Sequence, residues 1–191
     1  GHIKITDPES GEVLIDKRNA IHYENMSIAL AESLANAGQG PIYKMAFGNG
    51  GTAVDPTGII TYLTPNSTGT NASLYNQTFA KVVDDQASNN TDPVRNKIET
   101  RHVSGTNYTD ILVSCLLDYG EPSGQDAFDT TTNTENLYVF DELGLISAGA
   151  SGADGRLLTH VIFHPVQKSL NRLIQIDYTV RVQSLTGFNE V

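Results

Sequence analysis

Two histidines, His160 and His164, have the spacing that most resembles a metal-binding motif. On a helix, a separation of four residues places both rings on one face, as two ligands of one ion require. The surrounding sequence, LLTHVIFHP, is instead rich in β-forming residues and ends at a proline. On a strand the two rings share a face but stand ~13 Å apart. We therefore expect these histidines to pack or to face solvent, and we expect no metal site or cofactor.

A glycine-rich segment, FGNGGT at residues 47–52, resembles a phosphate-binding loop in composition. It lacks the Lys-Ser/Thr pair of a P-loop and the Gly-x-Gly-x-x-Gly spacing of a dinucleotide site. We therefore expect a simple glycine turn. Its glycines are expected to permit positive φ or the close approach of another chain.

Acidic side chains in the predicted loops are the remaining candidates for chemistry. They do not match the Asp-x-Asp-x-Asp-Gly pattern of a calcium loop. Ser114 and Cys115 lie inside an apolar run without the glycines of a nucleophile elbow. A glycan hydrolase would need two loop carboxylates across a cleft, and nothing in the sequence selects a pair. The available carboxylates are Glu121, Asp126, Asp129 and Glu135. We expect no enzyme and no catalytic residues, with a glycan hydrolase kept as the third hypothesis.

The composition limits the classes of partner. The net charge is −10, and 12 Lys and Arg residues are spread over 191 positions, which argues against nucleic-acid binding. No apolar run approaches the ~20 residues that cross a bilayer, so no membrane partner is expected. The single cysteine, Cys115, cannot form an internal disulfide and is expected to be a small buried hydrophobe. The polar first residues do not resemble a secretion signal.

The elements that must position these residues are mainly strands. Residues 174–183 alternate apolar and polar side chains without interruption, which predicts a half-buried strand. Residues 111–117 are nearly all apolar and predict a central strand covered on both faces. Further strands are expected at 42–47, 59–63, 78–83 and 97–103, and a hairpin at 3–16.

One helix is predicted over residues 23–37. Its apolar side chains recur at intervals of three and four residues, which indicates one buried face. Asn36 and Gly38 supply a C-terminal stop. The residues of the predicted apolar face are Tyr23, Met26, Leu30, Leu34 and Ala37.

Together these elements predict a mainly β fold, an antiparallel β-sandwich or jelly-roll-like domain with one N-terminal α-helix. The chain is expected to form one domain over residues 1–191, with the hairpin and helix in 1–40 and the β core in 41–191. Polar loops at 65–77 and 120–136 are long for a compact domain, and such loops often carry function. The candidate contact residues in the loops are Asn66, Asn71, Tyr75, Tyr108, Gln125, Asp126 and Phe128.

Two blocks of the sequence resemble a known group of proteins. Near the N-terminus stand AIHYENMSIALAESLAN and IYKMAFGNGG; near the C-terminus stand DELGLIS, GRLLTHVIFHPVQKS and LIQIDYTVRVQ. This arrangement resembles small structural proteins of tailed-bacteriophage virions, of the tail, collar, fibre-attachment or capsid-surface type. The resemblance covers residues 12–52 and 137–183, and the residues between them match nothing. It implies a virion protein without catalytic residues.

The expected function is therefore a non-enzymatic structural protein of a tailed-phage virion. It would assemble in several copies in the cytoplasm of the bacterial host, as a tail, neck or collar, or capsid-surface component. Its expected partners are other virion proteins and copies of itself. The alternative is a carbohydrate- or host-receptor-binding module on a phage fibre or capsid decoration, whose partner would be a host surface glycan.

Overall fold

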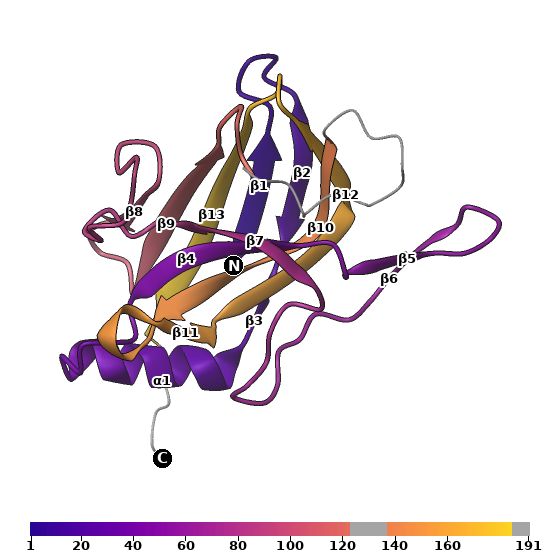
Figure 1. The fold of residues 1–191 in the computed structure, drawn as a ribbon. Helices are drawn as coiled ribbons and strands as arrows, with labels where there is room; N and C mark the ends of the chain where they lie inside the picture. The colour runs from indigo at the N-terminus through magenta and orange to yellow at the C-terminus, as the bar shows by residue number, and fades with distance from the viewer. Residues whose placement is uncertain (123–136, 185–191) are drawn as a thin grey trace.

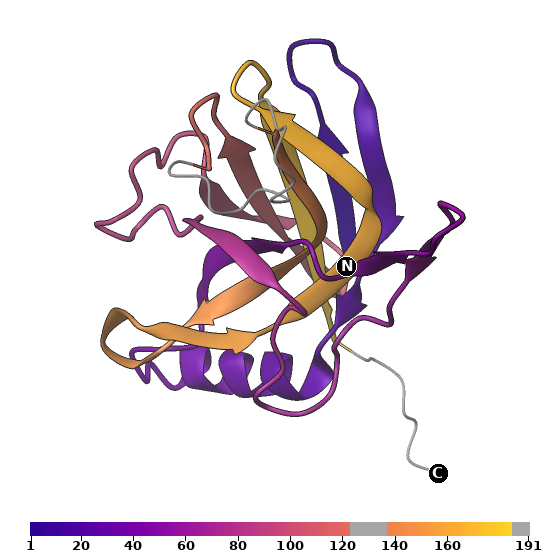
Figure 2. The same ribbon diagram turned by 45° about the vertical axis from the view of Figure 1, so that its right-hand side comes forward.

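The computed structural model describes residues 1–122 and 137–184. Two antiparallel sheets pack face to face as a sandwich, and one helix lies across one end of them (Figure 1). The predicted mainly β fold with a single N-terminal helix is confirmed. The same arrangement is seen after a turn of 45° (Figure 2), where the helix again lies at the end of the sandwich.

The first sheet has five strands, and both ends of the chain contribute to it. In spatial order these are β2 (Val13–Arg18), β1 (His2–Thr6), β13 (Ile174–Gln183), β9 (Tyr108–Leu117) and β8 (Lys97–His102). The predicted hairpin forms from β1 and β2. Because β1 lies between β2 and β13, and Ile3 and Ile5 are fully buried, the N-terminal hairpin belongs to the core of the domain.

The second sheet contains the longest strands. Its order is β3 (Ala20–Ile21), β12 (Thr159–Ser169), β10 (Leu137–Ala148), β4 (Ile42–Gly48) and β7 (Gln77–Val82), and β11 (Asp154–Leu157) pairs with β10. A short 3₁₀ helix, η1 (Ala150–Gly152), connects β10 to β11. A separate two-stranded ribbon, β5 (Thr52–Val54) with β6 (Ile60–Tyr62), leaves the body of the protein (Figure 1).

The core lies between the two sheets. In β13 the side chains of Ile174, Ile176, Tyr178 and Val180 are buried, as the alternation predicts, and they join the core cluster to which the second sheet contributes Met45, Phe47, Phe140 and Leu145. The apolar face of the last strand is therefore covered by the chain's own second sheet. Cys115 is fully buried in the same cluster, and its burial raises the pKa of the thiol to about 12. It is an unreactive hydrophobe, as predicted.

A lysine hydrogen bond joins the two sheets on each side of the sandwich. On one side, Lys17 Nζ of β2 donates to the carbonyl of Ile162 in β12 at 2.7 Å. On the other side, Lys81 Nζ of β7 donates to the carbonyl of Leu116 in β9 at 2.7 Å. Beyond this contact an apolar cavity lies between the sheets and the helix.

The helix α1 spans Tyr23–Leu34, with Ala35 as its C-cap. Asn36 and Gly38 have φ values of 51° and 71°, so the predicted stop signals act as expected. The buried residues are Asn25 and Ala29, and the Asn25 side chain donates to the carbonyl of Leu157 at 2.9 Å.

The predicted buried face of α1 is wrong. Tyr23 and Leu34 are 79% and 88% exposed, and Leu30 is 37% exposed. The helix is rotated by about a third of a turn from the expected orientation. The physical reason is a hydrogen bond: the Asn25 side chain donates to the carbonyl of Leu157, the last residue of β11, and the small Ala29 lets the helix approach closely.

Candidate functional site

The closest approach to a catalytic constellation is a buried cluster of two carboxylates and a histidine on the second sheet. Asp141 and Glu142 are neighbours in β10 and are 3% and 0% exposed. A β-bulge interrupts the pairing of β10 with β12 between Phe140 and Glu142. Such a bulge changes the direction of a side chain, and here both adjacent carboxylates bind one segment, the glycine turn that follows β4.

The glycine turn donates its backbone N–H groups to these carboxylates. Asp141 accepts from the N–H groups of Gly51 at 2.8 Å and Thr52 at 2.9 Å, and from the hydroxyl of Thr52. Glu142 Oε1 accepts from the N–H of Gly50 at 3.1 Å. The turn therefore has no spare donors at these positions for a phosphate.

The glycines of this turn are required by close packing within the chain. A Cβ on Gly48 would stand 2.4 Å from the carbonyl oxygen of Asn76, and one on Gly50 would stand 2.8 Å from the Asn76 nitrogen. Gly48, Gly50 and Gly51 do not have positive φ. Of the two expected reasons for glycine, close approach is confirmed, but the approaching segment belongs to the same chain.

Glu142 also binds the loop before β7 and a histidine. Its Oε1 accepts from the Asn76 N–H at 2.8 Å, and its Oε2 accepts from the Tyr75 N–H at 2.9 Å. The Nε2 of His160, a fully buried ring, lies 2.9 Å from Oε2. Since His160 Nδ1 accepts from the Asn66 N–H at 2.7 Å, the proton lies on Nε2 and is donated to Glu142.

The cluster therefore fixes loops and leaves no group free for chemistry. Burial favours a raised pKa for Glu142, but the hydrogen bonds from His160 and from the N–H groups of Asn76, Tyr75 and Gly50 outweigh it and lower the pKa. A catalytic acid or base at neutral pH needs a raised carboxyl pKa or an open lone pair. Glu142 has neither, and its side chain is fully buried.

The other histidines have separate partners. His164 lies on β12, as expected for a strand, and its Nδ1 is 3.3 Å from the hydroxyl of Tyr62. His22 is the N-cap of α1: its Nδ1 accepts from the Asn25 N–H at 3.2 Å. His22 Nε2 donates to the carbonyl of Gly69 at 2.9 Å. Within residues 1–122 and 137–184, no three His, Cys, Asp or Glu side chains are grouped as a metal site.

The predicted contact loop at 65–77 is partly a structural element. Leu74 is buried in a small apolar cluster on the outer face of the second sheet, and Asn66 is half-buried. Asn71 and Tyr75 are exposed. The Tyr75 hydroxyl donates to the Thr64 carbonyl at 2.6 Å.

The remaining predicted contact residues are distributed over different places. Tyr108 begins β9, and the guanidinium of Arg181 lies 3.8 Å from its ring centre. Tyr75 lies in the loop before β7 of the second sheet and Tyr108 on β9 of the first, so they do not form one aromatic platform. Gln125, Asp126 and Phe128 lie outside the described residues, as do Asp129, Glu135 and most of the loop 120–136.

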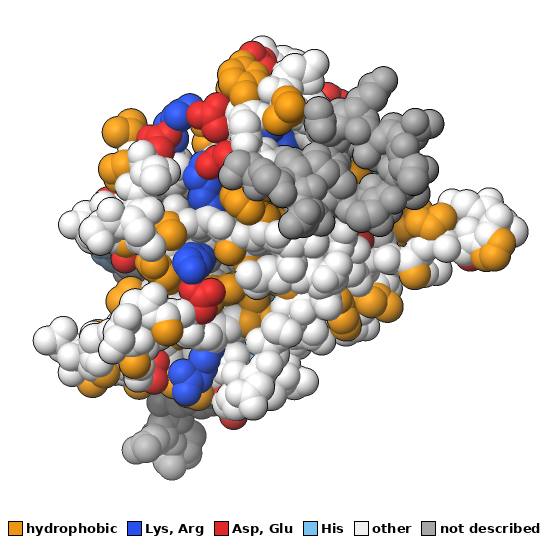
Figure 3. Space-filling model, in the orientation of Figure 1, with side chains coloured by type: hydrophobic (Ala, Val, Ile, Leu, Met, Phe, Trp, Pro, Cys, Tyr) orange, Lys and Arg blue, Asp and Glu red, His pale blue; other side chains and the backbone are white. Residues whose placement is uncertain are grey.

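The ribbon β5–β6 forms a projecting arm, defined here as residues 52–63, which the sequence did not predict as a hairpin. Figures 1 and 3 show the arm standing away from the body with hydrophobic side chains near its end. Val54 and Ile59 are 64% and 61% exposed. At the tip, Asp55 accepts from the N–H groups of Thr57 at 2.8 Å and Ile59 at 3.0 Å. Its pKa is lowered, first by the Thr57 hydroxyl and then by the Ile59 N–H.

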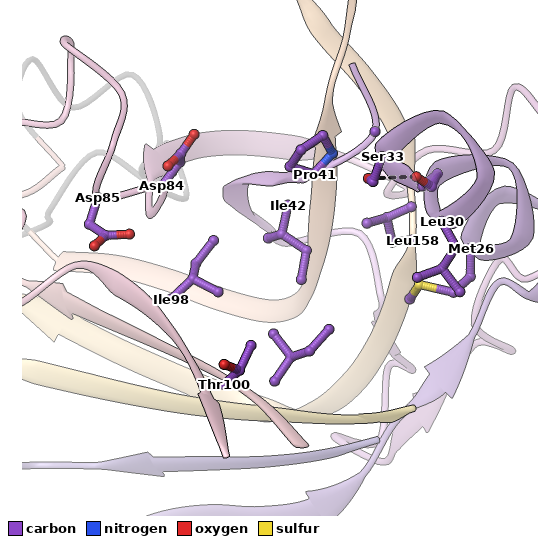
Figure 4. A pocket seen from close by; sticks show the side chains of 13 residues that line it. Met26, Leu30, Ser33, Pro41, Ile42, Asp84, Asp85, Ile98, Thr100 and Leu158 are labelled. Atoms are coloured by element: carbon purple, nitrogen blue, oxygen red, sulfur yellow. Dashed lines mark hydrogen bonds between the residues drawn. The ribbon is translucent and has the colours of Figure 1, made fainter. Parts of the chain in front are cut away.

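The cavity between the sheets and α1 is the most apolar concave feature described. It has a volume of about 350 Å³, and its wall includes Ile42, Ile98, Ile111 and Leu158 (Figure 4). Met26 and Leu30 of α1 close one side, and Asp84 and Asp85 stand at the other (Figure 4).

A buried lysine, Lys168, lies at the C-terminal end of β12. Lys168 is 1% exposed, and its Nζ donates to the carbonyls of Ser169 at 2.7 Å and Tyr119 at 3.3 Å. Burial lowers its pKa to about 8. No pattern in the sequence predicts a buried lysine here, because a lysine in an alternating strand is normally exposed.

Comparison with known proteins found no match: no family model, no curated protein and no solved structure is similar to this chain. Among the described helices, none is long and apolar enough to cross a membrane.

Proposed function

We propose that this chain is a non-enzymatic structural protein of a tailed-phage virion, present in several copies as a tail, neck or collar, or capsid-surface component. It assembles in the cytoplasm of the bacterial host and contacts other virion proteins and copies of itself. The observation that carries the proposal is the arm, residues 52–63, with its exposed apolar side chains. The resemblance of the terminal blocks supplies the virion context.

The arm has the properties of a contact element. A two-stranded ribbon alone is marginally stable in water. Here the Asp55 turn holds the tip, and the ring of Tyr62 at the base lies 5.8 Å from Lys17 Nζ. The arm is therefore ordered before binding, which reduces the entropic cost of association. Burying Val54 and Ile59 on a neighbour would contribute about 1.5–3 kcal/mol each.

The buried cluster supports a structural role over an enzymatic one. The carboxylates most suited to chemistry, Asp141 and Glu142, hold backbone N–H groups instead of facing a cleft. The glycan-binding alternative needs neighbouring exposed aromatic rings, and the hydroxyl of Tyr75 and the ring of Tyr108 are already engaged by the chain itself.

The test uses particles of the phage that encodes the chain. Quantitative mass spectrometry of purified particles is expected to find several copies per particle. The variant carrying Val54→Ser and Ile59→Ser should fold normally but enter particles at least tenfold less often. Val94→Ser is the matched control, because Val94 is exposed in a loop away from the arm.

Two results would reject the proposal. One is the absence of the chain from purified particles. The other is full incorporation of the arm double variant, which would show that the arm makes no contact needed for assembly.

A further inference from the structure

Most of an apolar stripe on α1 is left uncovered by the described part of the chain. Tyr23, Met26, Leu30 and Leu34 have the spacing of one helix face, and of these only Met26 packs against the core. Tyr23 and Leu34 are 79% and 88% exposed, because Asn25 and Ala29 face the body instead. Single exposed apolar residues are ordinary, but three on one helix face beside a cavity mark an interaction surface.

The stripe continues into the cavity between the two sheets. Met26 and Leu30 belong to both, and Figure 4 shows them with Leu158 on one side of the space, while Ile42 and Ile98 lie toward the other. The far wall is β8, which supplies Ile98 and Thr100. β8 is the last strand of its sheet among the described residues, so its outer N–H and C=O groups can pair with an extended segment.

The mouth of the cavity is acidic. Asp84 Oδ1 accepts from the Gln86 N–H at 2.9 Å, and Asp85 Oδ2 accepts from the Gln86 side-chain amide at 3.2 Å. In the described part of the chain, neither carboxylate forms an ion pair with Lys, Arg or His. Each retains lone pairs that a cation can use.

The exposed area suits a short segment better than a second folded subunit. Tyr23, Leu30 and Leu34 together expose roughly 300–400 Å² if a fully exposed side chain of this size offers about 150–200 Å². A stable pair of subunits needs about 800 Å² from each partner. The charge argues in the same direction, since a second copy would bring its own acidic surface, including the Asp55 tip of its arm.

We propose that the cavity and the adjoining stripe of α1 bind an extended apolar segment of another virion protein, flanked by Lys or Arg that pair with Asp84 and Asp85. The apolar side chains of the segment enter between Leu30 and Ile98, and its backbone pairs with β8. Only the source of the segment, another virion protein, rests on the proposed function.

The test is a binding measurement on the purified full chain. The probe is a capped octapeptide in which three leucines alternate with three serines and two lysines follow; the matched peptide ends in two glutamates. Methyl NMR spectra report the site through Ile98, Ile111 and Leu158. The lysine peptide should shift these methyl signals and bind at least about fivefold more tightly than the glutamate peptide.

Variants separate the apolar and the charged contributions. Leu30→Ser should weaken binding of the lysine peptide at least threefold, whereas Leu170→Ser, a leucine exposed on the turn before β13, should leave it unchanged. Replacing both Asp84 and Asp85 by Asn should abolish the preference for lysine. The Asp16→Asn control, on exposed β2, should retain it.

Four results would overturn the inference: no methyl shift with either peptide, equal binding of both peptides, equally tight binding of decyl maltoside, or the same shifts on raising protein concentration alone. The last two would assign the site to a small amphiphile or to a second copy. The peptide measurement involves no phage particle. A negative result in it would therefore not affect the incorporation test of the arm, and a negative incorporation test would not affect the peptide measurement.

Discussion

The buried cluster around Glu142 and the apolar surfaces on the arm and α1 are opposite exceptions to the rule that charged groups lie outside a protein and apolar groups inside it. Glu142 is a charged group inside the protein, and four donors surround its two oxygens. Val54, Ile59 and Leu34 are apolar groups outside it, and they are 64%, 61% and 88% exposed. The chain satisfies its costly buried charge internally and leaves apolar area available to neighbours.

This difference indicates where function lies. Buried polar groups are tolerated only when hydrogen-bonded, so the Glu142 cluster is explained by the folding of two loops. Exposed apolar side chains on an ordered arm gain nothing for the isolated chain. Changes in the cluster should therefore alter stability, and changes on the arm or the stripe should alter association.

The largest effect is expected from Glu142→Gln. The amide keeps one oxygen but places an NH₂ group against the N–H of Tyr75 or Asn76, which leaves a buried donor without an acceptor. We expect the free energy of unfolding to fall by about 2–4 kcal/mol in urea denaturation. Glu99→Gln, on an exposed position of β8, should change it by less than about 0.5 kcal/mol. Equal effects of the two substitutions would contradict the structural role of the cluster.

Acid should destabilise the wild type through the same group. The hydrogen bonds of Glu142 lower its pKa in the folded state, so its contribution is present above the unfolded value of about 4.3. That contribution is lost as pH falls through the lower folded pKa. Urea denaturation between about pH 6 and pH 3 should show a steeper loss for the wild type than for Glu142→Gln. Parallel curves would mean that another group controls acid stability.

Lys168 is a second buried charged group. Unlike Glu142, it forms no hydrogen bond with an ionisable side chain in the part of the chain that the structure describes. Because its folded pKa is lowered from 10.5 to about 8, the unfolded chain binds more protons between these values, and stability rises with pH there. The Lys168 contribution is of the order of 2 kcal/mol up to about pH 9.5, and it is read as the difference between the pH dependence of the wild type and that of Lys168→Met. The difference is needed because burial also raises the pKa of Cys115, which opposes the gain from about pH 8.5 upward, and of Tyr138 and Tyr178, which oppose it at higher pH.

The smallest effects on stability are expected at the apolar surfaces. Ile59→Ser and Leu34→Ser should each change the free energy of unfolding by less than about 0.5 kcal/mol, since both side chains are already in water. A loss above about 2 kcal/mol in thermal or urea denaturation would show that these residues stabilise the monomer and would remove the contrast with Glu142.

Much of the fold could be predicted from periodicity. The alternation at Ile174–Gln183 specifies a strand with one covered face. The apolar run around Cys115 does form an inner strand, β9, but the predicted cover on both faces is wrong: Val113, Cys115 and Leu117 lie in the core, whereas Leu112 and Ser114 on the other face are half-buried. These patterns follow directly from burial. The hairpin β1–β2 was likewise indicated by its turn residues, although not its place inside the first sheet.

The site was less predictable because it depends on register. The register of β10 against β12 shifts beside Asp141 and Glu142, with two extra residues on β12, and no sequence period signals such a shift. The spacing of Tyr23, Leu30 and Leu34 did indicate an apolar face, but the hydrogen bond of Asn25 decided which face is buried. Adjacent carboxylates inside an otherwise apolar strand, together with a distant glycine-rich turn, were the signal that could have suggested the cluster.

The central claim is that the exposed apolar arm serves association and not folding. Its most direct test is the incorporation of the Val54→Ser, Ile59→Ser double variant into phage particles, measured together with its free energy of unfolding. We expect a free energy of unfolding within about 1 kcal/mol of the wild type and a loss of incorporation of at least tenfold. Normal incorporation of a stable variant would contradict it.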